Sequence, residues 1–393
     1  MRVTPPRDPG PPPWAPQKCY SEFFMAAPES NFVRACKGQH TPFTPVWFMR
    51  QAGRYLPEYR AIRAKHTLLE ICQQPELAAE VTLQPVRLLG VDAAILFADI
   101  LLPLIPMGID LEFAAGEGPI IHNPIGSARD VESLRSIDPH ESLHHVLEAV
   151  RIVQRELDGA TPLIGFAGAP FTLASYIVEG GSSRNYIKTK KLMYGDPATW
   201  HKLMNKLTHV VADYLVAQID AGTQAVQLFD SWIGALSPDD YREYVLPYSQ
   251  LILKAIKQTG APAIHFGTDT ATLLPLMKEA GGEVIGLDWR TPLDWAWSIL
   301  GNDVAVQGNL DPVVLFAPRA EIERRVRSIL DQAAGRSGHI FNLGHGILPD
   351  TPVENVRAVV DMVHEFSANN SPLRWRRAQR LSQNDSQRIT KAS

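Results

Sequence analysis

Eight short apolar runs, mostly separated by stretches long enough to hold a helix, constrain the fold of this 393-residue chain more than any other feature. Most runs are continuously apolar rather than alternating, which is typical of strands covered on both faces. The runs are TPVWFMR (44–50), AAILFAD (93–99), PLIGFAG (162–168), AVQLFDS (225–231), PAIHFG (262–267), EVIGLDW (283–289), VAVQGNL (304–310) and HIFNLGHG (339–346). They predict a parallel sheet with helical crossovers.

The segments between these runs show helical periodicity. PELAAEVTLQPVRLLG (75–90) has proline in its first turn and ends at glycine. Residues 200–222, 318–335 and 351–366 also repeat apolar positions at helical spacing. Eight βα units predict an α/β fold with one (β/α)8 TIM barrel as a single domain over residues 31–367. A doubly wound open sheet is the alternative, although no GxGxxG follows the first run.

The two ends of the chain differ in composition from the rest. Residues 1–30 begin with a proline-rich stretch and residues 368–393 are polar and basic, so both are predicted to be disordered. The start lacks the apolar region of a signal peptide, and no run approaches the roughly 18 to 20 residues of a membrane span. The three cysteines are widely spaced, which favours reduced thiols. We therefore expect a cytoplasmic protein that does not contact membranes.

The charge balance restricts the partners. With 38 basic and 42 acidic residues, the net charge is -4, so nucleic acid is not expected to bind and any anion site must be local. In a parallel barrel, catalytic residues gather at the carboxyl ends of the strands. Those ends supply Arg50 and Arg54, Asp99, a loop through Tyr176, Asp230 and Ser231, Gly267, Asp288, Asn309, Asn342 and His345. Cations, carboxylates and neutral donors together indicate a site for an anionic substrate.

Arg50 and Arg54 follow the first apolar run and can approach one ligand together. A guanidinium presents a planar fork of donors that suits carboxylate or phosphate, although pairing with a local acid such as Glu58 is the alternative. Asp99 is flanked by apolar residues, where a carboxylate is costly unless donors or positive charge offset it. It is either an acceptor for the substrate or a helix cap or buried partner of the arginines.

Three further residues have both a functional and a structural interpretation. Tyr176 can donate to an anion or pack as an ordinary core tyrosine. No GxSxG surrounds Ser231, so it binds a ligand or caps a helix rather than acting as a nucleophile. His345, between two glycines at the exit of the last run, is either structural or part of the site. Gly267 occupies the position where an H-x-C pair from His265 would need cysteine, so no zinc site is expected.

From about Asn31 to Phe366, these segments together resemble the uroporphyrinogen decarboxylase family. PVWFMRQAGRYLPEYR (45–60) and GFAGAPFTLASYIVEGG (165–181) are similar to the two family signatures, and FADIL, QLFDS and NLGHGILPDTP agree in content and order. The resemblance implies a (β/α)8 barrel and a homodimer, with no metal and no cofactor. It also implies loss of carbon dioxide from the four acetates of uroporphyrinogen III, which gives coproporphyrinogen III for porphyrin, haem and chlorophyll biosynthesis.

The resemblance also assigns site residues, with Asp99, Arg50 and Tyr176 as the expected catalytic residues. The identity of the proton donor stays open between Arg50, a water molecule and a substrate carboxyl group. Two other functions stay open as well: a corrinoid-linked zinc methyltransferase and a tetrapyrrole-binding barrel without turnover. The expected substrate-binding residues are Arg50, Gln51, Ala52, Gly53, Arg54, Asp99, Tyr176, Phe229 as an apolar wall, Ser231 and His345.

Overall fold

The computed structural model describes residues 29–114 and 118–368. The expected terminal extensions, residues 1–30 and 368–393, lie almost wholly outside the described residues. Within the described ranges, no helix combines the length and the hydropathy that crossing a bilayer requires.

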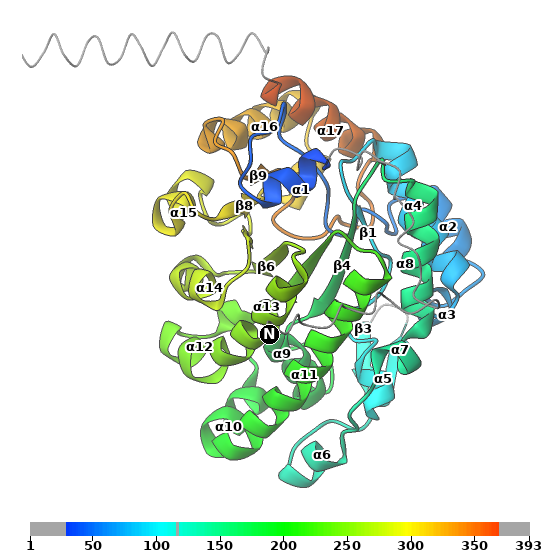
Figure 1. The fold of residues 1–393 in the computed structure, drawn as a ribbon, viewed down its shortest axis with the longest axis vertical. Coiled ribbons are helices and arrows are strands. Elements are labelled where there is room, and N and C mark those ends of the chain that lie inside the picture. Colours follow the sequence, from blue (N-terminus) through cyan, green and yellow to red (C-terminus); the bar gives the residue numbers. More distant parts are fainter. Residues whose placement is uncertain (1–28, 115–117, 369–393) are drawn as a thin grey trace, which may run out of the picture.

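A curled sheet of seven parallel strands forms the centre of the molecule (Figure 1). Its strand order follows the chain order throughout, whereas a doubly wound sheet reverses direction at a switch point, so the doubly wound alternative is wrong and the α/β barrel-like fold is confirmed. A separate antiparallel hairpin, β2 with β3, was not expected from the sequence. The strands are β1 (Ala94–Ile95), β2 (Leu111–Ala114), β3 (Gly118–Ile121), β4 (Leu163–Gly168), β5 (Ala225–Asp230), β6 (Ala263–Gly267), β7 (Val284–Gly286), β8 (Ala305–Gln307) and β9 (His339–Ile340).

The first apolar run, 44–50, was expected to be a strand, and the structure corrects this. It makes one parallel bridge, between Val46 and Phe341, and the carbonyl of Val46 accepts from the N–H of Asp92 at 2.8 Å. The run therefore lies between β9 and β1 and closes the barrel. Pro45 has no N–H to donate, and the N–H of Val46 is taken by the Asp92 carboxylate at 2.7 Å, so a regular ladder cannot extend.

Helices surround the sheet (Figure 1). The helices predicted over 75–90, 200–222, 318–335 and 351–366 are confirmed as α4, α11, α16 and α17. Their bounds, with the other α-helices, are α1 (Asn31–Cys36), α2 (Pro57–Arg63), α3 (Leu68–Gln73), α4 (Pro75–Leu89), α5 (Leu104–Met107), α6 (Ala128–Ser133), α7 (Pro139–Ser142), α8 (His144–Leu157), α9 (Pro170–Glu179), α10 (Ile187–Gly195), α11 (Pro197–Ala221), α12 (Pro238–Tyr244), α13 (Leu246–Thr259), α14 (Leu274–Ala280), α15 (Leu293–Leu300), α16 (Arg319–Ala333) and α17 (Val353–Ser367). Three short 3-10 helices are η1 (Ile233–Ala235), η2 (Ala271–Leu273) and η3 (Pro312–Phe316).

Hydrogen bonds between side chains identify the inner face of the curled sheet. Gln307 in β8 donates to Gln227 in β5 at 3.0 Å, although these strands are not neighbours, so both side chains must point into the barrel. Trp47 donates to Gln307 at 3.0 Å and belongs to the same layer. Since alternate residues of a strand share a face, Phe229 also points inward, while Asp230 points outward.

Candidate active site

The turn that follows the barrel-closing run is held by Gln51, whose side chain is fully buried. Its Oε1 accepts from the N–H of Phe48 and its Nε2 donates to the carbonyl of Ala93, each at 3.0 Å. Its backbone carbonyl accepts from the hydroxyl of Tyr55 at 2.7 Å. These bonds fix the turn against β1, so Gln51 positions the arginines on either side of it, and its expected contact with a substrate stays a prediction.

Arg50 has a left-handed backbone with φ of 58°, which is uncommon for a long side chain. Its aliphatic stem crosses Gly346 so closely that a Cβ at that glycine would clash with the Cβ, Cγ and Cδ atoms of Arg50. The N–H of Ile347 donates to the carbonyl of Met49 at 2.9 Å, which joins the same two segments. The glycine after His345 is therefore needed here, because it lets the Arg50 side chain pass over the exit of β9.

Asp99 follows β1 and is partly buried. Burial raises the pKa of its carboxyl group, while the N–H of Leu101, donating to Oδ1 at 2.9 Å, and the positive charge of Arg50 oppose that rise. Arg50 is therefore near enough to stabilise the ionised form of Asp99. A carboxylate and a guanidinium thus share one region at the carboxyl ends of the strands.

Tyr176 lies on α9, so the loop expected there is wrong. Pro170 begins this helix at a position that proline favours, and Gly180 ends it with a left-handed backbone. The pKa of the Tyr176 hydroxyl is raised to about 12. The main cause is burial, the negative charge of Asp99 adds to it, and the positive charge of Arg50 opposes it. The hydroxyl therefore stays protonated at neutral pH and can donate a hydrogen bond.

Trp232 stacks on Tyr176 with ring centroids 3.9 Å apart and an interplanar angle of 33°. Its ring also contacts Tyr186, with centroids 5.3 Å apart. The three aromatic rings therefore form one cluster that restricts the position of Tyr176. The sequence prediction missed Trp232, although an aromatic residue directly after the Ser231 strand end was a usable signal.

His345 is partly buried at the exit of β9. Burial, followed by the positive charges of Arg50 and Arg290, lowers the pKa of its imidazole to about 4, against a smaller opposing effect of Asp288. The imidazole is therefore neutral near pH 7 and can offer a hydrogen bond rather than a positive charge.

Phe229 forms an apolar surface inside the barrel. Its ring meets Phe166 edge-on at 5.5 Å and Phe266 at 5.9 Å between centroids. Next to it, the carbonyl of Ser231 accepts from the hydroxyl of Thr268 at 2.6 Å. These contacts place an aromatic cluster beside a polar backbone group at the carboxyl end of β5.

The structure brings Asp99, Arg50, Tyr176 and His345 together, because Arg50 influences the pKa of each of the other three. Arg54 is exposed in the turn after Arg50, where Ala52 and Gly53 are partly buried. This arrangement can bind carboxylates through the arginines, donate neutral hydrogen bonds, and accept N–H groups at Asp99.

Asp230 and His265 point away from this site. The side chains of both are fully buried between the sheet and the helices, where Thr172 on α9 donates to Asp230 Oδ1 at 3.1 Å. His265 Nε2 lies 3.8 Å from Asp230 Oδ2, too far for a hydrogen bond. Burial raises the pKa of Asp230. This pair belongs to the packing of the helix layer.

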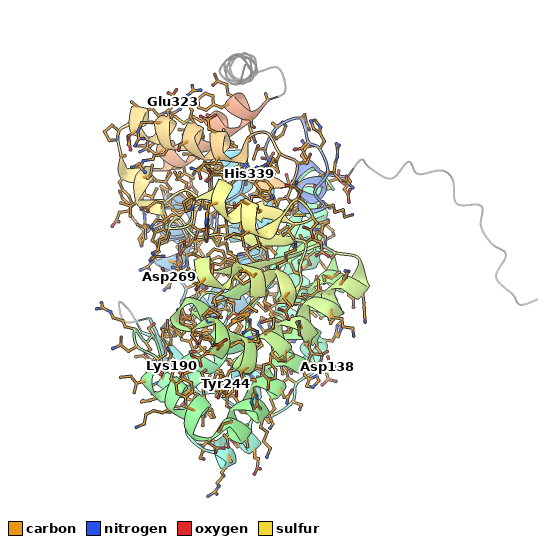
Figure 2. The ribbon with its side chains drawn as sticks, turned by 90° about the vertical axis from the view of Figure 1, so that its left-hand side faces the viewer. Asp138, Lys190, Tyr244, Asp269, Glu323 and His339 are labelled. Atoms are coloured by element: carbon orange, nitrogen blue, oxygen red, sulfur yellow. The ribbon has the colours of Figure 1, made fainter. Side chains whose placement is uncertain are left out.

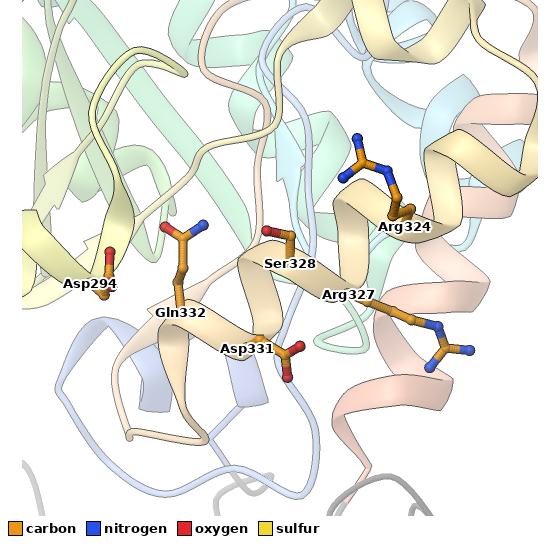
Figure 3. A pocket seen from close by; sticks show the side chains of 6 residues that line it. All are labelled: Asp294, Arg324, Arg327, Ser328, Asp331 and Gln332. Atoms are coloured by element: carbon orange, nitrogen blue, oxygen red, sulfur yellow. The ribbon is translucent and has the colours of Figure 1, made fainter. Parts of the chain in front are cut away.

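Within residues 29–114 and 118–368, the site residues are not accompanied by a cluster of metal-ligating side chains. Among the described residues, no group of three or more His, Cys, Asp or Glu side chains is arranged to hold a metal ion. Figure 3 shows a shallow polar hollow on α16, with Asp294 of α15 beside it, where the chain presents charged side chains to solvent. It is formed by outer helices and contains none of the site residues named above.

The family model described as uroporphyrinogen decarboxylase (URO-D) matches residues 27–366. A protein named uroporphyrinogen decarboxylase from Sorangium cellulosum (strain So ce56) is 63% identical over 336 residues, which cover 86% of this chain and 96% of that protein. A second protein of that name, from Carboxydothermus hydrogenoformans (strain ATCC BAA-161 / DSM 6008 / Z-2901), is 58% identical over 338 residues. The match covers 86% of this chain and 97% of that protein. The solved structure of a methyltransferase from Methanosarcina mazei has a TM-score of 0.72 and 20% sequence identity, and the match covers 86% of this chain and 98% of that chain. At this identity the similarity shows a shared fold and nothing about activity.

Proposed function

This chain belongs to the uroporphyrinogen decarboxylase family, and from that premise we propose that it removes carbon dioxide from the four acetate side chains of uroporphyrinogen III. The product is coproporphyrinogen III, an intermediate of tetrapyrrole biosynthesis. Asp99, Arg50 and Tyr176 are the proposed catalytic residues of this reaction.

One observation supports the proposed site: the positive charge of Arg50 favours the ionised form of Asp99, so the two residues lie near each other at the carboxyl ends of the strands. Uroporphyrinogen has carboxylates around its edge and pyrrole N–H groups at its centre. Arginines suit the edge, because a guanidinium binds a carboxylate through paired hydrogen bonds. A carboxylate suits the centre, because it accepts hydrogen bonds from N–H groups. The two residues together match both parts of the substrate.

Decarboxylation needs a sink for the electrons of the bond between the methylene and the carboxylate. Protonation of the adjacent pyrrole carbon makes the ring a cation, and the electrons of the breaking bond then flow into that ring as carbon dioxide leaves. A second proton converts the methylene to the methyl group of the product, and the ring gives up the first. Asp99 stabilises the ring cation, and its hydrogen bonds strengthen as positive charge develops on the pyrrole nitrogens.

The remaining residues bind and orient the substrate. Arg50 and Arg54 hold carboxylates, while the neutral donors Tyr176, Ser231 and His345 fix the direction from which the macrocycle enters. Phe229 supplies an apolar surface for a pyrrole ring. Ala52 and Gly53 lie in the turn between the arginines, and Gln51 fixes that turn through its buried amide.

Anaerobic incubation of the purified chain with uroporphyrinogen III tests the proposal. The products are oxidised and separated by chromatography, which resolves porphyrins with eight, seven, six, five and four carboxylates. We expect the four-carboxylate product to accumulate in the absence of added metal or cofactor. Recovery of the octacarboxylate alone would overturn the function, and a tightly bound zinc ion with methyl transfer would favour the methyltransferase alternative.

We also propose that the protein is a homodimer in the cytoplasm, because it resembles a family with that organisation. Analytical ultracentrifugation at micromolar concentration tests the assembly, and a single species with the mass of one chain would contradict it.

A further inference from the structure

A cluster of three charged residues, none of them assigned to the site so far, lies at the exits of β6 and β7. Asp269 follows β6, while Asp288 and Arg290 follow β7. The Asp288 side chain is fully buried, whereas the side chains of Arg290 and Asp269 are 47% and 54% exposed. Figure 2 shows Asp269 at the edge of the molecule. The cluster is therefore anchored inside and open on its outer side.

Arg290 is held from several directions. Its Nη1 donates to Asp288 Oδ2 at 2.7 Å, and its backbone N–H donates to Asp288 Oδ1 at 3.0 Å. Its Nε lies 3.0 Å from Asp269 Oδ1, and its guanidinium carbon lies 4.1 Å from the centre of the Trp289 ring. A guanidinium has five N–H donors, so these contacts through Nε and Nη1 leave donors for a ligand.

The same cluster adjoins the candidate active site. The positive charges of Arg290 and Arg50 both lower the pKa of His345. The backbone also passes closely here, since a Cβ at Gly344 would clash with the backbone nitrogen of Trp289. Arg290 follows β7, whereas Arg50 follows the segment that closes the barrel, so the two positive charges act on His345 from separate parts of the chain.

We propose that Arg290 is a third substrate-binding cation, which takes one carboxylate of the polycarboxylate substrate at the rim of the pocket. This inference rests on the proposed function and adds a residue to it. It also explains how a chain with a net charge of -4 gathers positive charge around one ligand from separate strands.

The two aspartates have different parts in this proposal. Asp288 is buried and also accepts from the backbone N–H of Asp269 at 2.6 Å, so it stays in place and orients Arg290. Asp269 is half exposed, and an exposed ion pair of this kind is weak. Asp269 therefore pairs with Arg290 when the site is empty. A substrate carboxylate can displace Asp269 from Arg290 at little cost in free energy, so the two carboxylates compete for Arg290.

Arg290→Gln and a matched control, Arg324→Gln, test the proposal. Arg324 lies on the outer helix α16 in an exposed pair with Glu321, so its replacement makes the same change in net charge far from the site. Binding of uroporphyrinogen III is followed anaerobically by quenching of tryptophan fluorescence, and steady-state rates are measured in parallel. We expect R290Q to raise Kd and KM about three- to tenfold, with kcat within about twofold, as for loss of one charge-assisted hydrogen bond. R324Q should match the wild type.

An unchanged Kd in folded R290Q, or an equal rise in R324Q, would overturn the proposal. If R290Q does not fold by circular dichroism, Asp269→Asn decides, because it keeps Arg290 and Asp288 and removes only the competing carboxylate. D269N should lower the Kd for uroporphyrinogen III. An unchanged or higher Kd would contradict the proposal that Arg290 binds a substrate carboxylate. If the wild type binds uroporphyrinogen III but forms no product, the proposed function fails, while the comparison of Kd values still tests Arg290.

Discussion

Two aspartates with nearly the same sequence context have opposite surroundings. Asp99 ends ILFAD and Asp230 ends QLFD, and burial raises the pKa of both carboxyl groups. Asp99 lies within the influence of the positive charge of Arg50, whereas Asp230 points into the helix layer toward Thr172. Asp230 is the last residue of β5 and takes the outer face that strand alternation gives it, whereas Asp99 lies four residues beyond the end of β1, in the segment that leaves the sheet. Burial alone therefore does not identify a functional carboxylate, and the charge opposite it does.

The largest expected effect is that of Asp99→Asn. We expect kcat to fall by at least about 100-fold, since an amide cannot offset the charge of the ring cation as a preorganised carboxylate does. Unfolding should not become easier at pH 7. The raised pKa means that the folded state favours the protonated form, so the ionised carboxylate opposes folding once the pH exceeds that pKa. Product chromatography and thermal unfolding measure the two quantities.

Asp230→Asn is the matched control for this comparison, because it makes the same change on the other side of the sheet. Its carboxyl group contacts Thr172 rather than the pocket, so kcat should stay within about threefold of the wild type, as expected for a site outside the reacting groups. Equal losses of activity in D99N and D230N would contradict the assignment of Asp99 to the active site and of Asp230 to the packing of the helix layer.

Arg50→Ala should have the next largest effect. We expect a loss of about 10- to 100-fold in kcat/KM, because the substitution removes a carboxylate ligand and the cation that favours ionised Asp99. Arg54→Ala removes the same charge from a more distant, exposed position of the turn and should cost less. Steady-state kinetics under anaerobic conditions compare the two variants, and an unchanged kcat and KM in R50A would refute the role of Arg50.

The sequence predicted the barrel because continuous apolar runs and helical periodicity are local patterns. It did not predict that the run at 44–50 closes the barrel through one bridge, since that outcome depends on the Asp92 carboxylate taking the N–H of Val46. It placed both Asp99 and Asp230 at strand ends, but only Asp230 ends a strand, since β1 stops at Ile95 and leaves Asp99 in the segment after it. Trp232 and Arg290 were missed because their contacts join segments that are distant in the chain.

Trp232→Leu should have a smaller effect than the changes at Asp99 and Arg50. The leucine keeps apolar volume but loses the stacking on Tyr176, and aromatic pairs contribute about 0.5–1.5 kcal/mol, which corresponds to at most about tenfold in rate. Trp232→Phe should restore most of the activity, because a ring can stack again. If W232L and W232F are equally impaired, the stacking does not position Tyr176.

The smallest expected effect is a change in the pKa of one histidine. It compares a histidine of the candidate site, His345, with a histidine of the core, His339. His345 and His339 both have a pKa lowered to about 4, but burial alone lowers that of His339, whereas Arg50 and Arg290 contribute at His345. In Arg50→Ala, the pKa of His345 should therefore rise toward 6.5, while that of His339 stays unchanged. NMR titration of the imidazole protons measures both values in one sample, and parallel shifts would contradict the assignment.

The lowered pKa of His345 also predicts how the free energy of unfolding changes with pH in Arg50→Ala. A lowered pKa means that the unfolded chain binds the proton more tightly, so stability is full above about pH 6.5 and is lost as the pH falls toward 4. In Arg50→Ala this acid loss at His345 becomes smaller, because the folded and unfolded pKa values move closer together. Chemical denaturation between about pH 6.5 and 4.5 should thus give a shallower fall for R50A than for the wild type. A steeper fall would mean that Arg50 does not act on His345 within the pocket.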